Sequence, residues 1–278
     1  MRKFATAAFL LIVMSLPGQT AGTRPDDPVV KRTLGFYGRV NHWADDRAEL
    51  RKELRLMGRS GVDGYMIELA GWAETAVWKG DYLTRTEKEY RYLLRQCRRR
   101  GLWLFVSIVN DNMGLGKYGD PGIALEDIPD KAHELMEIVL KEGPDNVLVQ
   151  PVAEVRTAAG ARFEAECREA LSGFLLVHNG GWGFPHSRPE GFFARAVHPP
   201  AADFPVPQDA FVISDHGSFI PKLTVDGTFT GDADPDKLSE WLRRMKKLRV
   251  PVAGYYAFQR KVTDETAIRT VGTVLREP

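Results

Sequence analysis

Four times in its first half, the chain repeats one pattern: an amphipathic segment ends at a glycine and is followed by a short, almost entirely apolar run. The four apolar runs cover residues 62–68, 102–109, 147–154 and 174–178. Short runs with little alternation are typical of strands that are covered on both faces, as in a parallel sheet. Helices that alternate with such strands predict repeated βα units and therefore an α/β fold.

The other segments bring the predicted strands to eight. One strand is predicted at 34–37, before the first repeat, and three more are predicted at 192–198, 210–214 and 252–258. Proline-rich connections occupy the places of the fifth and sixth helices, so these helices are expected to be short or replaced by loops. The sequence therefore predicts a single (β/α)8 TIM barrel.

Local signals predict where helices begin and which faces they bury. The first helix is expected directly after Asp46, and the spacing of Thr86 and Glu89 matches a capping box that would open the second helix. Cys97 and Cys167 fall on the apolar stripes of two different helices. We expect both cysteines to be buried and too far apart to form a disulfide.

The first 22 residues have the plan of a secretory signal peptide, with a basic start, an apolar stretch over 4–16 and a small, polar end. We therefore expect a signal peptide at 1–22 and a TIM-barrel domain at 23–278, exported to the periplasm or beyond. The 38 Lys and Arg residues nearly balance the 37 Asp and Glu residues, so neither nucleic acid nor a membrane surface is an expected partner. The mature protein is expected to be a monomer.

Carboxylates follow two of the predicted strands. In a TIM barrel the C-terminal ends of all strands line one mouth, so Glu154 after the fourth strand and Asp215 after the seventh should share it. Glycosidic cleavage needs one carboxyl group to protonate the departing oxygen and a second to attack or to activate water. We assign the first role to Glu154 and the second to Asp215, with Glu68 after the second strand as the reserve candidate, because a carboxylate there could act as a base or bind a sugar hydroxyl.

Other polar and aromatic residues at the predicted strand ends have the chemistry needed to bind a sugar. Amides, imidazoles and carboxylates can hydrogen-bond to hydroxyl groups, and aromatic faces pack against the C–H face of a ring. For each aromatic, a space-filling role between barrel and helix is the alternative. The expected substrate-binding residues are Glu68, Asn110, Asn179, Trp182, His42, Trp43, His178, His216 and Tyr256.

Carboxylates after strands four and seven of an exported barrel resemble the arrangement of glycoside hydrolase clan A. The resemblance implies a retaining glycosidase that needs no cofactor, with the acid/base on strand four and the nucleophile on strand seven. Two positions depart from the clan pattern: Ala153 precedes Glu154 where many members have asparagine, and Asp215 stands where they have glutamate.

Two alternatives stay open at this point. His42, His178, His198 and His216 lie near predicted strand ends and could serve a metal-dependent hydrolase, although their spacing matches no known ligand motif. A barrel that binds carbohydrate without cleaving it would need the same aromatics and only one of the two carboxylates. Serine-hydrolase elbows, dinucleotide-binding glycine motifs and phosphate-binding loops do not occur in the sequence.

Overall fold

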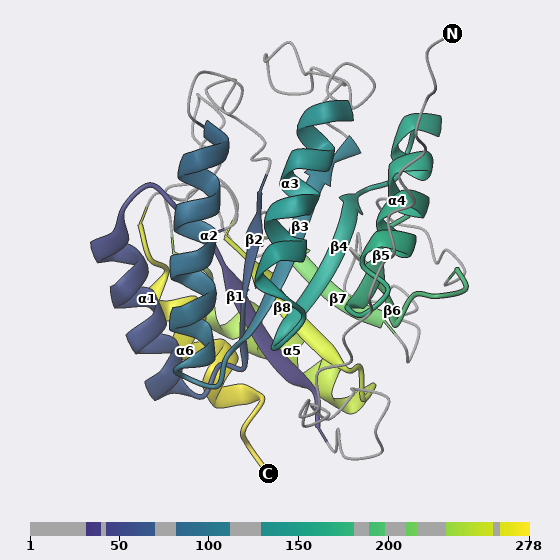
Figure 1. Cartoon of the computed structure of the whole chain (residues 1–278). Helices are drawn as coiled ribbons and strands as arrows, with labels where there is room; N and C mark the ends of the chain where they lie inside the picture. The colour runs from purple at the N-terminus through teal and green to yellow at the C-terminus, as the bar shows by residue number, and fades with distance from the viewer. Residues whose placement is uncertain are drawn as a thin grey trace, which may run out of the picture.

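A computed structural model gives the fold as a closed barrel of eight parallel strands in sequence order, with each strand paired to the next and β8 paired to β1 (Figure 1). The structure describes residues 32–39, 43–69, 82–111, 129–180, 189–197, 210–215, 232–257 and 262–278. The predicted signal peptide lies outside these residues. The strands are β1 (Leu34–Gly38), β2 (Gly64–Glu68), β3 (Trp103–Asn110), β4 (Val147–Ala153), β5 (Leu175–His178), β6 (Ala194–Val197), β7 (Ala210–Asp215) and β8 (Val252–Tyr256).

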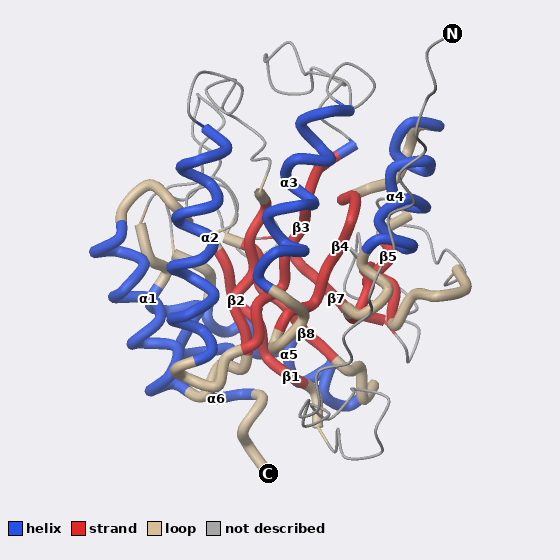
Figure 2. The backbone as a smooth tube through the Cα atoms, in the orientation of Figure 1, coloured by secondary structure: helices blue, strands red, loops and turns tan. Residues whose placement is uncertain are grey.

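Helices surround the strands on the outside of the barrel, as the blue segments around the red ones show in Figure 2. In the described part of the chain they number six, and none lies between β5 and β7. The predicted TIM barrel is thereby confirmed, whereas most of the connections in which the fifth and sixth helices were expected to be reduced, at 181–188 and 198–209, lie outside the described residues. The helices are α1 (Arg47–Ser60), α2 (Tyr82–Arg98), α3 (Pro129–Glu142), α4 (Ala158–Ala170), α5 (Pro235–Lys247) and α6 (Glu265–Val274).

The predicted helix start after Asp46 is confirmed, whereas the one predicted at Thr86 is not. The side chain of Asp46 accepts hydrogen bonds from the first turn of α1, and that of Asp234 does the same for α5. The predicted start of the second helix at Thr86 is wrong, because α2 already begins at Tyr82 and Thr86 lies in its second turn. Glu89 instead accepts a hydrogen bond from Nε of Arg47 at 2.8 Å, so the would-be capping residue joins α2 to α1.

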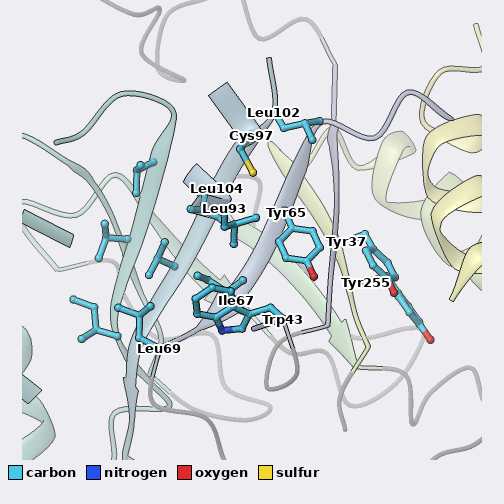
Figure 3. Packing of buried hydrophobic residues seen from close by; sticks show 14 of the residues in the cluster. Tyr37, Trp43, Tyr65, Ile67, Leu69, Leu93, Cys97, Leu102, Leu104 and Tyr255 are labelled. Carbon is cyan, nitrogen blue, oxygen red and sulfur yellow. The ribbon is translucent and has the colours of Figure 1, made fainter. Parts of the chain in front are cut away.

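Two apolar clusters fill the structure. The smaller one lies inside the barrel; its buried members come from all eight strands and from no helix, and they include Phe36, Met66, Phe105, Leu148 and Val177. The larger one lies between strands and helices, and Figure 3 shows part of it. Each fully buried side chain of this size contributes about 1.5–3 kcal/mol to the free energy of unfolding. In β2, for example, Met66 faces the interior cluster while its neighbours Tyr65 and Ile67 belong to the outer one, as alternation along a strand requires.

Closure of the barrel depends on one close backbone contact. Gly38 ends β1 in register with Tyr256 of β8. A Cβ atom at position 38 would lie 2.1 Å from the carbonyl oxygen of Met66 in β2, so only glycine lets these strands approach. The close approach brings the ends of β1, β2 and β8 together.

Both cysteines are buried and unpaired, as predicted: Cys97 lies on α2 and Cys167 on α4. No helix among the described residues is long and apolar enough to cross a lipid bilayer.

Candidate active site

The interior of the barrel changes from apolar to polar at the C-terminal ends of the strands. Two residues beyond Met66, Phe105 and Leu148, the same strands carry Glu68, Ser107 and Gln150, which are in register with one another. Nε2 of Gln150 donates to Oγ of Ser107 at 3.0 Å. Asn179, which follows β5 and is fully buried, donates from Nδ2 to Oε1 of Gln150 at 3.5 Å. These side chains form a polar layer on top of the apolar barrel core.

Glu68 is the most buried acidic group of this layer, with 3% of its surface exposed. The hydroxyl of Tyr256 in β8 donates to its Oε1 at 2.8 Å, while its Oε2 is buried and has no hydrogen-bond partner in the part of the chain that the structure describes. Burial raises the pKa of Glu68 from 4.5 to about 8; hydrogen bonds from Tyr256 and Asn110 oppose the rise, and the negative charge of Glu154 adds to it. Glu68 is therefore predominantly protonated at neutral pH.

Glu154 follows directly after β4, in a turn with left-handed backbone. Its φ of 57° is unusual for a residue with a side chain and costs roughly 1–2 kcal/mol relative to an ordinary conformation. The side chain is largely buried, and its Oε2 lies 2.5 Å from Nη2 of Arg156. A guanidinium at this distance favours the ionised form of the carboxyl group. Backbone strain of this kind tends to occur at functional sites, where the surrounding contacts maintain it.

Contacts from both neighbouring strands hold the Glu154 turn. Asp111, directly after β3, accepts hydrogen bonds at 2.7 Å from the backbone N–H groups of Arg156 and Thr157, and a third at 2.8 Å from the Thr157 hydroxyl. On the other side, the N–H of Val155 donates to the carbonyl of Asn179 at 2.8 Å. The role of Asp111 in fixing this turn depends on contacts with residues 45 and 46 positions further along the sequence, so a local pattern could not reveal it.

Two of the expected substrate-binding residues lie elsewhere. Trp43 is buried in the outer cluster beside Ile67 and Leu69 (Figure 3), and its Nε1 donates to the backbone carbonyl of Glu68 at 2.9 Å. The prediction for Trp43 is corrected to the space-filling alternative.

His178 also faces outward. Its neighbour Val177 belongs to the interior cluster, so strand alternation turns His178 towards the helices. There its Nδ1 lies 2.8 Å from Oε1 of Glu164 in α4, and its ring meets Phe192 edge-on. The expectation that His178 binds substrate is therefore corrected to a contact between the barrel and α4.

Of the expected site residues, the structure brings together Glu68, Asn110, Glu154 and Tyr256, with Asn179 in the polar layer. Asp215, predicted to follow directly after the seventh strand, is the last residue of β7, and its backbone is in register with Tyr256. Among the residues with described side chains, no group of three His, Cys, Asp or Glu residues could hold a metal ion. Three of the expected site residues, His42, Trp182 and His216, lie outside the described part of the chain. The same holds for His198, which was considered as a metal ligand.

Comparison with solved structures finds the same barrel in glycoside hydrolases. A family 5 enzyme from Prevotella bryantii B14, in complex with a xyloglucan tetradecasaccharide, is 10% identical and matches with a TM-score of 0.58 over 92% of this chain and 99% of its own. A GH5-4 broad-specificity endoglucanase from an uncultured bacterium is 12% identical, with a TM-score of 0.56 over 92% and 96% of the two chains. A Bacteroides ovatus family 5 xyloglucanase with a bound heptasaccharide is 12% identical, with a TM-score of 0.50 over 94% of this chain and 78% of its own.

These matches confirm the predicted likeness to a clan A barrel at the level of the fold. No family model and no curated protein matches the chain. Function must therefore be argued from the site itself.

Proposed function

We propose that this protein is a glycoside hydrolase that cleaves O-glycosidic bonds of a poly- or oligosaccharide with two carboxyl groups at the C-terminal mouth of the barrel. One observation carries the proposal: Glu68 ends β2 and Glu154 directly follows β4, so both stand at the C-terminal mouth of the barrel, and the charge of Glu154 is one of the causes that raise the pKa of Glu68. Their surroundings differ, since Glu68 is buried beside a tyrosine and Glu154 contacts an arginine. Two carboxyl groups held in different protonation states are what glycosidic cleavage requires.

Glu154 is one member of the proposed pair. Asp215 was the second member predicted from the sequence, and its position at the end of β7 agrees with that assignment. Glu68 is the second member that the electrostatic contact favours. Asn110, Asn179 and Tyr256 would bind the hydroxyl groups of the sugar, because their polar groups belong to the same layer or reach Glu68. This chemistry needs no cofactor.

The proposed substrates are plant-type glucans, on the ground that the structurally similar enzymes include an endoglucanase and xyloglucan-bound proteins. Retention of anomeric configuration is the outcome we propose, in line with the clan A resemblance. Export and a monomeric state complete the proposal, with the signal-like start of the sequence as support for the first.

The test is release of reducing ends from xyloglucan, β-glucan, mannan and xylan. We expect wild-type protein to cleave at least one of them, and Glu154→Gln to lose on the order of 10³-fold or more in turnover while still binding it. Glu164→Gln is the matched control, since Glu164 is also buried and paired but faces His178 on the outer side of the barrel.

Two results would count against the proposal. Full turnover by Glu154→Gln would remove Glu154 from the mechanism. Binding of a glycan by wild-type protein without any cleavage would instead identify a carbohydrate-binding barrel.

A further inference from the structure

We propose that the outer face of α1 and α2 binds an acidic polysaccharide through the carboxylate groups of the polymer. This surface lies on the helical wall of the barrel and not at the strand ends, so the inference goes beyond the proposed function. The chain as a whole is almost neutral, with 38 Lys and Arg residues against 37 Asp and Glu residues. Its exposed charges are nevertheless distributed unevenly over the surface.

Helices α1 and α2 lie side by side on this wall (Figure 1). Nε of Arg47 in α1 donates to Oε2 of Glu89 in α2 at 2.8 Å, and the Arg47 guanidinium lies 4.7 Å from the centre of the Tyr92 ring. Leu54 of α1 and Leu93 of α2 are fully buried in the outer cluster, so the opposite sides of both helices face solvent. These sides carry six exposed basic residues, which we call the basic face: Arg51, Arg55, Arg59, Lys88, Arg95 and Arg99.

None of these six residues forms an ion pair with an acidic residue in the part of the chain that the structure describes. Several other exposed cations are paired, as Lys52 is with Glu265 at 2.9 Å and Arg243 is with Glu277 at 3.2 Å. Exposed glutamates gather instead on α3 and α4, at Glu134, Glu137, Glu166 and Glu169. The positive charge of the basic face is therefore not neutralised by its neighbours.

The stability of the helices does not explain the basic face. Arginine recurs at every fourth position of α1 from 47 to 59, and like charges at this spacing repel each other. Cations offset the helix dipole only within the last turn, which accounts for Arg59 and Arg95. Arg51, Arg55 and Lys88 lie in earlier turns. Their repulsion becomes an attraction once an anionic partner lies across them.

The composition of the basic face fits a partner that carries carboxylate groups. Five of its six residues are arginines, and a guanidinium donates two parallel N–H groups to one carboxylate. Arginines four residues apart on α1 are separated by about 6 Å along the helix axis. The face therefore presents a row of repeated donors, which matches a linear polymer with repeated acidic groups.

Two other polyanions fit less well. A stable hold on a lipid surface takes apolar side chains or a lipid chain in addition to positive charge. The exposed large hydrophobic residues of the described chain are Leu140 and Val262, and neither lies on α1 or α2. Nucleic acid would attract the same cations. Polysaccharide is favoured over nucleic acid because the signal-like start of the sequence supports export.

Binding to polygalacturonate tests the proposal without any measurement of turnover. Wild-type protein should bind the polymer at low ionic strength, and the affinity should fall as salt is added. The combined variant Arg55→Gln, Arg59→Gln, Arg95→Gln and Arg99→Gln should bind on the order of tenfold more weakly or worse. Lysine at the same four positions keeps the charge and should recover part of the affinity, because only the paired N–H geometry is lost.

The matched control removes the same charge from other helices. It combines four exposed positions on α4 and α5: Arg162→Gln, Arg168→Gln, Arg243→Gln and Lys247→Gln. We expect its dissociation constant to stay within about twofold of wild type. Far-UV circular dichroism checks that both glutamine variants keep their helices.

Several results would overturn the proposal. Equal weakening in the two glutamine variants would mean that net charge alone governs binding, and unchanged binding in the α1–α2 variant would place the polymer elsewhere. Absence of binding by wild-type protein would also reject the proposal. Tighter binding to phosphatidylglycerol vesicles or to duplex DNA than to polygalacturonate would identify a different partner. Failure to cleave any polysaccharide would refute the proposed function and leave this test unaffected.

Discussion

Tyr256 and Glu68 are 188 residues apart in the sequence, yet the tyrosine hydroxyl donates a hydrogen bond to the glutamate at 2.8 Å. Closure of the barrel explains the contact. Tyr256 ends β8 and Glu68 ends β2, and only β1, which ends in the small Gly38, separates these strands. The hydrogen bond therefore links the chemistry of the site to the step that completes the fold.

Tyr256→Phe should move the alkaline limb of the pH–rate profile to higher pH. The hydroxyl of Tyr256 lowers the pKa of Glu68, so its removal should raise that pKa further above about 8 and keep the acid protonated in more basic solution. Profiles of kcat/KM measure the shift. Tyr90→Phe is the control, because the buried Tyr90 hydroxyl on α2 has no hydrogen-bond partner among the described residues. A limb that moves to lower pH would contradict the prediction.

Glu68→Gln should weaken the dependence of stability on pH. The pKa of Glu68 is raised on folding, so folded and unfolded chains both hold its proton below about 4.5, and only the folded chain holds it up to about 8. The free energy of unfolding of the wild type should therefore fall as the pH rises through this window. Urea unfolding should be measured near pH 4.5 and near pH 8. Between these two pH values, the free energy of unfolding of the variant should rise relative to that of the wild type by a few kcal/mol. If the free energies of unfolding of the two proteins differ by the same amount at both pH values, Glu68 is not neutral in the folded protein.

Asp111→Ala should reduce kcat with little change in KM. The variant loses three hydrogen bonds to the turn that carries Glu154, and small displacements of a reacting group cost about tenfold or more in rate. Asp111→Asn should recover part of the rate, since its amide oxygen can still accept from the backbone. Asp46→Ala loses comparable hydrogen bonds at the start of α1 and should cost about 1 kcal/mol of stability without lowering kcat. Equal loss of kcat in both alanine variants would indicate a general effect of stability.

Arg39→Leu should destabilise the fold by about 3–5 kcal/mol, because it leaves a buried glutamate without its charge partner. Nε of Arg39 lies 2.6 Å from Oε1 of Glu53, and both side chains are fully buried between the barrel and α1. The same change at Arg32, whose ion pair with Asp63 is partly exposed, should cost only about 0–1 kcal/mol. Chemical denaturation measures both values. Similar losses in the free energy of unfolding for the two variants would mean that burial does not increase the contribution of the Arg39–Glu53 pair to stability.

Much of the architecture could be predicted because it follows from local patterns. Short apolar strands, glycine stops and helix caps such as Asp46 and Asp234 depend on residues within a few positions of one another. The same locality explains the failure at Thr86. A capping box can occur by chance inside a helix, and whether it caps depends on the backbone before it.

The candidate site could be predicted only in part. Position after a strand identified Glu68, Glu154 and Tyr256, since all strand ends share one mouth. The same criterion also selected His178, because it did not consider which side of the strand each residue faces. The support of the Glu154 turn by Asp111 and Asn179 could not be predicted, since it depends on how neighbouring strands are aligned.

The anchoring of Glu154 by Asp111 and Asn179 has a practical consequence for engineering. Both supports belong to the ends of β3 and β5, so the carboxylate is fixed by the scaffold. Surface connections elsewhere on the rim could then be lengthened, shortened or exchanged to change which glycan is accepted, while the reacting group keeps its place.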